Sequence, residues 1–384
     1  MRPEMRPDLL ARSGVLLATA ILCGFAVALS QTSNCSGCAG NDAEKIAKPA
    51  ITTTPARNGA VIVSMSSATA SAKILFTLDG SAPSASSAST ITYLAPFLVA
   101  SNLTLTAQAI SAGPSHAASA LVTLPFTPNI APGSLVWSDE FANSTSANTL
   151  PNSQVWTYDT GNSGFGNQEL ETYCAAASKA LPCDPANPNA YDDPSGILHI
   201  VARMPSPGVY TSARLKTQGL FSFQYGRIEA RMKLPESQGM WPAFWLLGNN
   251  ITLVNWPACG ELDVMEHING SNPQNEGFDW VQGSVHGAGL DGGTQFHPAG
   301  FSAAAWHTYG MIWAKGKIQY YVNDPSSVYA TFTPATQPGT WPFDSGPEFI
   351  ILNLAVGGNW PGSPDATTVF PSEAQIDYVR LYSN

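Results

Sequence analysis

Three carboxylates stand close together in a chain that is otherwise poor in acids. The segment Glu261-Leu262-Asp263-Val264-Met265-Glu266 holds three of only 27 Asp and Glu among 384 residues. Its other residues are apolar, and such an alternation predicts a β-strand. Because strand side chains alternate between two faces, Glu261 and Asp263 share a face and Glu266 has the opposite parity. One extra residue, a β-bulge at Val264 or Met265, would return Glu266 to that face.

Crowding like charges on one face opposes stability, so the segment favours a chemical role. Paired carboxylates on one surface are the groups that glycosidic-bond hydrolysis requires. Two indoles, Trp241 and Trp245, precede the segment, and His286 follows it in Gly283-Ser284-Val285-His286-Gly287. Indole faces stack on sugar rings and their N–H groups donate to hydroxyls. Taken singly, each of these three residues fits a structural role in the core equally well or better.

The elements that must position these residues are predicted to be strands. The chain has 33 Gly, 30 Pro and 10% aromatic residues but only 11% charged residues, which is typical of a turn-rich all-β protein. Short alternating runs between Pro49 and Phe126 predict a small β-sandwich, and those from Leu135 onward predict a larger two-sheet sandwich. We assign residues 48–126 and 135–384 to these domains. Residues 127–134, with two prolines and a glycine, form a linker that we expect to act as a hinge.

The first 47 residues are predicted to direct export. Three arginines precede the apolar run 14–29, so residues 1–30 are predicted to be a signal peptide, with an uncleaved membrane anchor as the alternative. Residues 31–47 are small and polar and form a linker. Six cysteines suit a secreted chain. We expect Cys174 and Cys183 to form a disulfide, Cys259 to be a buried apolar residue, and Cys35 and Cys38 to pair or stay free.

The net charge of −10 argues against nucleic acid or an anionic membrane surface as the partner. It also disfavours strongly sulfated polysaccharides. A neutral glycan fits better, and we expect the protein to be a monomer.

Two resemblances sharpen these expectations. The run Phe76-Thr77-Leu78-Asp79-Gly80-Ser81-Ala82-Pro83, followed by Tyr93, resembles the immunoglobulin-like domain appended to some chitobiases. No cluster of aromatics in this domain suggests a sugar-stacking platform, so a spacer role is favoured over carbohydrate binding.

The second resemblance covers some 245 residues. Glu-Leu-Asp-Val-Met-Glu, with Trp-Pro-Ala-Phe-Trp before it and Gly-Ser-Val-His-Gly after it, resembles family 16 of the glycoside hydrolases and, within it, the laminarinase-like endo-β-1,3-glucanases. Further matching runs are Trp137–Phe141, Gly166–Leu170, Tyr210–Thr217, Tyr225–Arg231, Asn353–Gly362 and Ile376–Arg380.

This resemblance implies a concanavalin-like β-jelly-roll and retention of anomeric configuration. It makes Glu261 the nucleophile and Glu266 the general acid and base, with Asp263 tuning the pair. Trp241, Trp245 and His286 would line the subsites around the cleaved bond. Asn167 and Arg214 would bind the sugar on its non-reducing side. No cofactor is required for this chemistry.

The family also implies a structural Ca²⁺, for which Glu140 and Asp377 are the matching carboxylates. Alternatively, both are ordinary polar residues.

The expected function is hydrolysis of β-1,3- or mixed β-1,3/1,4-glucans such as laminarin by a secreted enzyme. Two alternatives remain at this point. One is cleavage of another polysaccharide of the agar or carrageenan type. The other is a glucan-binding lectin without turnover, although such proteins typically lose the glutamates that are present here. Transglycosylation would use the same residues.

Overall fold

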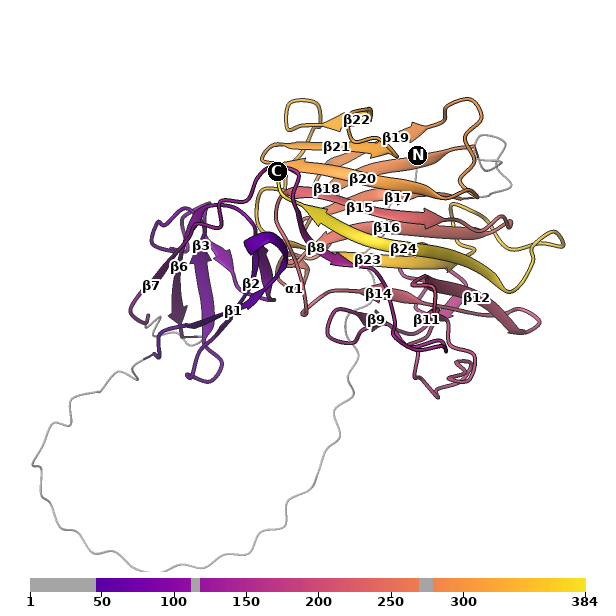
Figure 1. Ribbon diagram of the computed structural model, residues 1–384, viewed down its shortest axis with the longest axis horizontal. Coiled ribbons are helices and arrows are strands. Elements are labelled where there is room, and N and C mark those ends of the chain that lie inside the picture. Colours follow the sequence, from indigo (N-terminus) through magenta and orange to yellow (C-terminus); the bar gives the residue numbers. More distant parts are fainter. Residues whose placement is uncertain (1–45, 112–117, 269–278) are drawn as a thin grey trace, which may run out of the picture.

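The structure is a computed structural model that describes residues 46–111, 118–268 and 279–384 (Figure 1). The predicted signal peptide, most of the first linker, and Cys35 and Cys38 lie outside the described residues. Of the helices in the described residues, none has both the length and the apolar character that a membrane span needs.

The N-terminal domain is a small sandwich of two antiparallel sheets, as predicted (Figure 1). One sheet of the described residues has the order β1 (Ala50–Pro55), β2 (Val61–Ser66), β5 (Phe97–Val99). The other has the order β4 (Ile91–Thr92), β3 (Lys73–Thr77), β6 (Leu103–Ile110), β7 (Val122–Phe126), and the short 3₁₀ turn η1 (Arg57–Gly59) follows β1. Val63, Phe76, Phe97 and Leu105 fill the space between the sheets, together with Ile46. Ile46, two residues before the predicted start at 48, also belongs to this core.

The C-terminal region is a larger sandwich, which also agrees with the prediction (Figure 1). In the described residues its outer sheet has the order β10 (Glu171–Tyr173), β13 (Val209–Ser212), β12 (Leu198–Ser206), β24 (Ser372–Tyr382), β15 (Gly226–Lys233), β20 (His307–Ala314), β21 (Lys317–Val322), β22 (Val328–Phe332), with β11 (Ala190–Asp192) on β12 and β8 (Leu135–Asp139) on β24. The facing sheet has the order β19 (Leu290–Phe296), β18 (Val281–Gly287), β17 (Glu261–Glu266), β16 (Met240–Gly248), β23 (Glu348–Val356), β14 (Arg214–Lys216), β9 (Thr157–Asp159).

Alternation along the strands divides the facing sheet into a core side and a site side. On β16, Phe244 and Leu246 join the core between the sheets, whereas Trp245 and Leu247 point to the other side. Since successive side chains of a strand point in opposite directions, the tryptophans of this strand share the face that bears the carboxylates. A one-turn helix, α1 (Ile251–Val254), lies in the connection between β16 and β17.

The two boundaries of the larger sandwich are joined by hydrogen bonds. The Ser383 N–H donates to the Ser134 carbonyl oxygen (2.9 Å), and the Ser134 N–H donates to Ser383 Oγ (3.1 Å). Next to them, β8 pairs with the last strand, β24. Residues 134 and 383 are therefore neighbours in space.

The cysteines within the described residues follow the prediction. Cys174 and Cys183 form a disulfide with their Cα atoms 5.7 Å apart. Cys259 is buried and free, and its burial raises the pKa of its thiol to about 12. This thiol is therefore unreactive at neutral pH.

The two domains are docked, which differs from the spacer on a hinge that the sequence predicts. The side chain of Leu98 in the N-terminal domain belongs to the core of the larger sandwich, and its N–H donates to the Ser222 carbonyl oxygen (2.9 Å). Within the linker, the Asn129 N–H donates to Asn102 Oδ1 (3.1 Å). Composition of the linker shows its chemistry but not the contacts that the neighbouring domain supplies, so the hinge stays a prediction that these contacts do not support.

Candidate active site

The predicted bulge is present in β17. Against β16, Ala243 pairs with Glu266, Phe244 with Met265 and Trp245 with Asp263, so Val264 is the unpaired residue. The register also shifts by one residue between Asp263 and Glu266 against β18. Since one extra residue reverses the parity, Glu266 returns to the face of Glu261 and Asp263. The side chains of Val264 and Met265 both join the core.

The three carboxylates line a cavity of about 180 Å³ on the site side of the sheet. Four other predicted residues line it with them: Asn167, Arg214, Trp241 and Trp245. The lining also includes four residues that sequence reasoning did not select: Phe165, Glu169, Trp256 and Asn353. Of these, Glu169 and Asn353 stand inside runs that carried the family resemblance, so a signal for these two residues was available.

Each glutamate receives a hydrogen bond from an indole. Trp241 Nε1–H donates to Glu266 Oε1 (3.2 Å), and Trp256 Nε1–H donates to Glu261 Oε2 (3.0 Å). Because an indole N–H can only donate, each bond fixes the position of one carboxylate oxygen. Glu261 is 5% exposed and Glu266 3% exposed, so both are shielded from bulk water.

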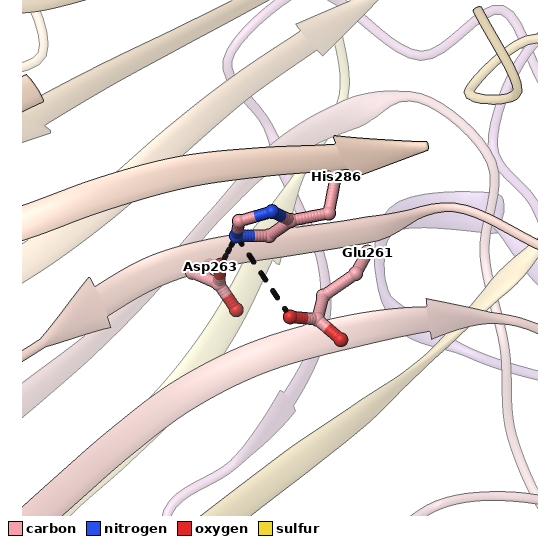
Figure 2. Close-up of side chains that lie close together, drawn as sticks. All are labelled: Glu261, Asp263 and His286. Carbon is pink, nitrogen blue, oxygen red and sulfur yellow. Dashed lines mark ion pairs between the residues drawn. The ribbon is translucent and has the colours of Figure 1, made fainter. Parts of the chain in front are cut away.

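His286 lies beside the carboxylates, as Figure 2 shows. It pairs with Glu261 across β17 and β18, and its Nε2 is 3.1 Å from Asp263 Oδ2 and 4.0 Å from Glu261 Oε1. Its Nδ1 is 3.0 Å from Asp291 Oδ1. Burial of the ring opposes protonation, but the bonds to Asp263 and Asp291 and the nearby negative charges outweigh it and raise the pKa of His286 to about 11.

His286 is therefore an imidazolium at neutral pH. Its role as a subsite residue stays a prediction, and it is not among the residues that line the cavity. The reason is its register: opposite Glu261, the ring is held between Asp263 on one side and Asp291 on the other. Its charge acts on the neighbouring carboxylates.

Another wall of the cavity combines an arginine with two aromatic rings. The guanidinium carbon of Arg214 lies 4.6 Å from the centre of the Trp245 ring and 5.1 Å from that of Phe165. Asp159 holds the same guanidinium, with Arg214 Nε 3.0 Å from Asp159 Oδ2. Trp245 Nε1–H donates to Asn353 Oδ1 (2.7 Å). Since its N–H is already used, Trp245 can offer a substrate ring contact but no free donor.

Asn167 is tied to the same wall through an acid. Asn167 Nδ2–H donates to Glu169 Oε1 (3.2 Å), and the Tyr173 hydroxyl donates to Glu169 Oε2 (2.9 Å). The Tyr173 hydroxyl also accepts from Asn353 Nδ2–H (3.2 Å). This network orients the polar groups that face the cavity.

Known proteins resemble this chain in sequence and in fold. Residues 155–380 match the glycosyl hydrolases family 16. This chain belongs to glycoside hydrolase family 16. Residues 54–123 match the chitobiase/beta-hexosaminidase C-terminal domain, in agreement with the smaller sandwich.

The relatives of this family 16 chain include several glucanases. It is 39% identical to a beta-glucanase of Rhodothermus marinus over 269 residues, which cover 65% of this chain and 84% of that protein. The laminarinase catalytic domain of Thermotoga maritima is 36% identical with a TM-score of 0.56, covering 66% of this chain and 99% of that chain. The endo-beta-1,3-glucanase of Pyrococcus furiosus is 38% identical with a TM-score of 0.55, covering 65% of this chain and 94% of that chain.

The two predicted calcium ligands of the family 16 domain are held by arginines instead. Arg380 donates to both carboxylate oxygens of Glu140 (3.0 and 2.7 Å), and Arg231 donates to Asp377 Oδ2 (2.6 Å). Two carboxylates that are neutralised in this way do not fit a shared Ca²⁺ site. Calcium binding stays a prediction without support from these side chains.

The described part of the chain contains one group of acidic and histidine side chains with the spacing of metal ligands. It consists of Glu261, Asp263 and His286 (Figure 2). A protonated imidazole cannot ligate a metal, so the ion pair accounts for this cluster.

Proposed function

We propose that this family 16 glycoside hydrolase cleaves internal β-1,3 bonds of glucans such as laminarin with retention of configuration, and accepts mixed β-1,3/1,4-glucan as a secondary substrate. The observation that carries the proposal is the bulge in β17, which gathers three carboxylates on one face of an aromatic-walled cavity. The similarity to laminarinases and endo-β-1,3-glucanases supports the choice of linkage.

The reaction has two steps. A Glu261 oxygen attacks the anomeric carbon while the glycosidic C–O bond breaks and its oxygen takes the proton of Glu266. Glu266, now a carboxylate, removes a proton from water, and the hydroxyl attacks the same carbon and releases Glu261. Both substitutions invert the carbon, so the overall result is retention.

Two indoles and the imidazolium of His286 support the three carboxylates in different ways. The bond from Trp256 stabilises the charge that Glu261 needs before attack. Trp241 holds Glu266 in place through a hydrogen bond to one of its oxygens. The charge of His286 keeps Asp263 ionised between the two glutamates.

Two glutamine variants test the roles. Glu261→Gln should lower kcat on laminarin by more than about 10³-fold while laminarin still binds, because the amide fills the same space without a nucleophilic charge. Glu266→Gln should lower kcat by about 10²- to 10⁴-fold on laminarin, and by much less on an aryl β-laminaribioside whose leaving group needs no proton. Unchanged turnover by Glu261→Gln would refute the nucleophile assignment.

A substrate panel tests the alternatives. Reducing ends released from laminarin, lichenan and agarose should rank in that order, with none from agarose. Activity on agarose alone would favour an agar-type hydrolase. Binding of laminarin without any turnover would favour a lectin.

We further propose that the protein is exported. The basic and apolar character of residues 1–30 supports a signal peptide, and the Cys174–Cys183 disulfide suits an oxidising compartment. Mass spectrometry of the protein from the culture medium should give a chain that starts near residue 31. A cell-bound chain that retains residues 1–30 would favour the membrane anchor.

A further inference from the structure

The connection between β16 and β17 forms one wall of the active-site cavity. Ile251 and Trp256 from this connection line the cavity, and Trp256 donates to the nucleophile Glu261. Apart from the single turn of α1, the connection has no regular structure of its own. A segment of this kind needs outside contacts to hold an indole in hydrogen-bonding position.

Ser222 supplies such a contact where the connection begins. Asn249 Nδ2–H donates to Ser222 Oγ (2.8 Å), and the Ser222 hydroxyl donates to the carbonyl oxygen of Pro96 (2.8 Å). The Ser222 carbonyl oxygen accepts the N–H of Leu98 (2.9 Å). Ser222 is fully buried, with 0% exposure. Pro96 and Leu98 flank the first residue of β5, so one serine joins the N-terminal domain to the wall of the cavity.

The N-terminal domain also lies behind α1. Leu253 and Val254 line a second cavity of about 340 Å³, whose other wall includes Tyr93 and Leu94 of the N-terminal domain. Figure 1 shows α1 on the side of the larger sandwich that faces this domain. The connection is therefore enclosed by the active-site cavity on one side and the N-terminal domain on the other.

We infer that the N-terminal domain braces the wall that holds the nucleophile, and that Ser222 is the positioning residue through which it does so. Pro96 and Leu98 fix Ser222, Ser222 fixes Asn249, and Asn249 anchors the connection that carries Trp256. The domain thus contributes to turnover without touching the sugar. This inference rests on Glu261 being the nucleophile.

Ser222→Ala in the full chain is the direct test, because alanine keeps the backbone bond to Leu98 and removes both hydroxyl bonds. It should lower kcat/KM on laminarin by about 3- to 10-fold, the effect of one or two lost hydrogen bonds. The acid limb of the pH profile should move to higher pH, since a loosened Trp256 stabilises the Glu261 carboxylate less. Trp256→Phe should shift the limb further, and the double variant should behave as Trp256→Phe alone.

Ser119→Ala is the matched control. Ser119 Oγ accepts the N–H of Ala109 (3.0 Å) inside the N-terminal domain, away from Ser222. This variant should lose stability and keep the wild-type pH profile. If Ser222→Ala does not fold, Asn249→Ala removes the same bond from the cavity side and should give the same shift.

Three outcomes would overturn the inference. They are an unmoved acid limb in a folded Ser222→Ala or Asn249→Ala variant, full additivity with Trp256→Phe, and an equal shift in Ser119→Ala. Failure of the proposed function is distinguishable, because it would appear as full activity of Glu261→Gln.

Discussion

The carboxylates of the site have partners of two kinds, neutral indoles and a cation. Neutral indoles hold Glu261 and Glu266, whereas the imidazolium of His286 is paired with Asp263. A neutral donor leaves a carboxylate free to change its charge during the reaction, and a cation keeps its partner ionised. Of the two carboxylates near the imidazolium, the middle acid Asp263 is the closer, at 3.1 Å against 4.0 Å for Glu261.

His286→Gln tests this difference at the residue scale. The variant should lower kcat by about 10-fold or more, because it removes a charge-assisted bond to Asp263. His297→Gln is the control, since His297 is exposed and its Nε2 lies 2.8 Å from Asp279 on the surface. Equal effects of the two substitutions would contradict the role of His286.

The same pair of variants has a pH signature. The pKa of His286 rises from 6.5 to about 11 on folding, so the stabilisation from its proton is complete below about pH 6.5. It is lost progressively as the pH rises and is gone above about pH 11. The free energy of unfolding, measured with urea, should therefore differ most between wild type and His286→Gln at pH 6 and much less at pH 10. A difference that grows with pH would argue against a protonated His286.

At the scale of elements, the bulge sets the position of Glu266. Deleting Val264 or Met265 leaves Glu-x-Asp-x-Glu, which keeps all three acids on one face but removes the bulge. Each deletion should preserve the fold and lower kcat by about 10²-fold, since a displacement near 1 Å has that cost. Hydrolysis of laminarin is the measurement.

Val264→Ala is the control for these deletions. It keeps the bulge, so activity should stay near wild type while unfolding requires about 1–3 kcal/mol less. A large loss of activity in Val264→Ala would mean that core packing rather than strand register positions Glu266.

The carboxylate strand could be predicted because its information is local. A strand has a period of two, and the odd parity of Glu266 demanded one extra residue, which β17 has. Trp241 and Trp245 follow the same rule on β16. Trp256 lies in an irregular connection whose path no period describes, so its bond to Glu261 could not be derived. His286 lies opposite Asp291 because β18 pairs with β19 in this register. The sequence of β18 does not show which strand pairs with it, so this contact could not be predicted.

At the scale of the molecule, the N-terminal domain shares a core with the catalytic sandwich. Ala60 and Leu98 pack into that core. The surfaces through which the two domains meet are therefore apolar and would be unfavourable in contact with water. The composition of residues 127–134 predicted that the two domains move relative to each other. Composition of a linker carries no information about the surfaces that the two domains bury against each other.

The shared core predicts joint unfolding. Scanning calorimetry should give a single transition for the wild type, because separating the domains exposes Leu98. Leu98→Ser should lower the transition temperature and split it into two. Leu121→Ser is the control, since Leu121 is 46% exposed, and it should leave one transition near the wild-type temperature. Two transitions in the wild type would contradict the shared core.

The bonds between Ser134 and Ser383 have a practical consequence for engineering. A sandwich whose entry and exit points touch can be grafted into a surface loop of another protein without stretching either chain, once the apolar surface that Leu98 covers has been made polar. It can also be circularly permuted, with a short linker between residues 383 and 134 and new termini in a surface turn. The catalytic sandwich of this glucanase is therefore suited to transfer into other proteins as a unit.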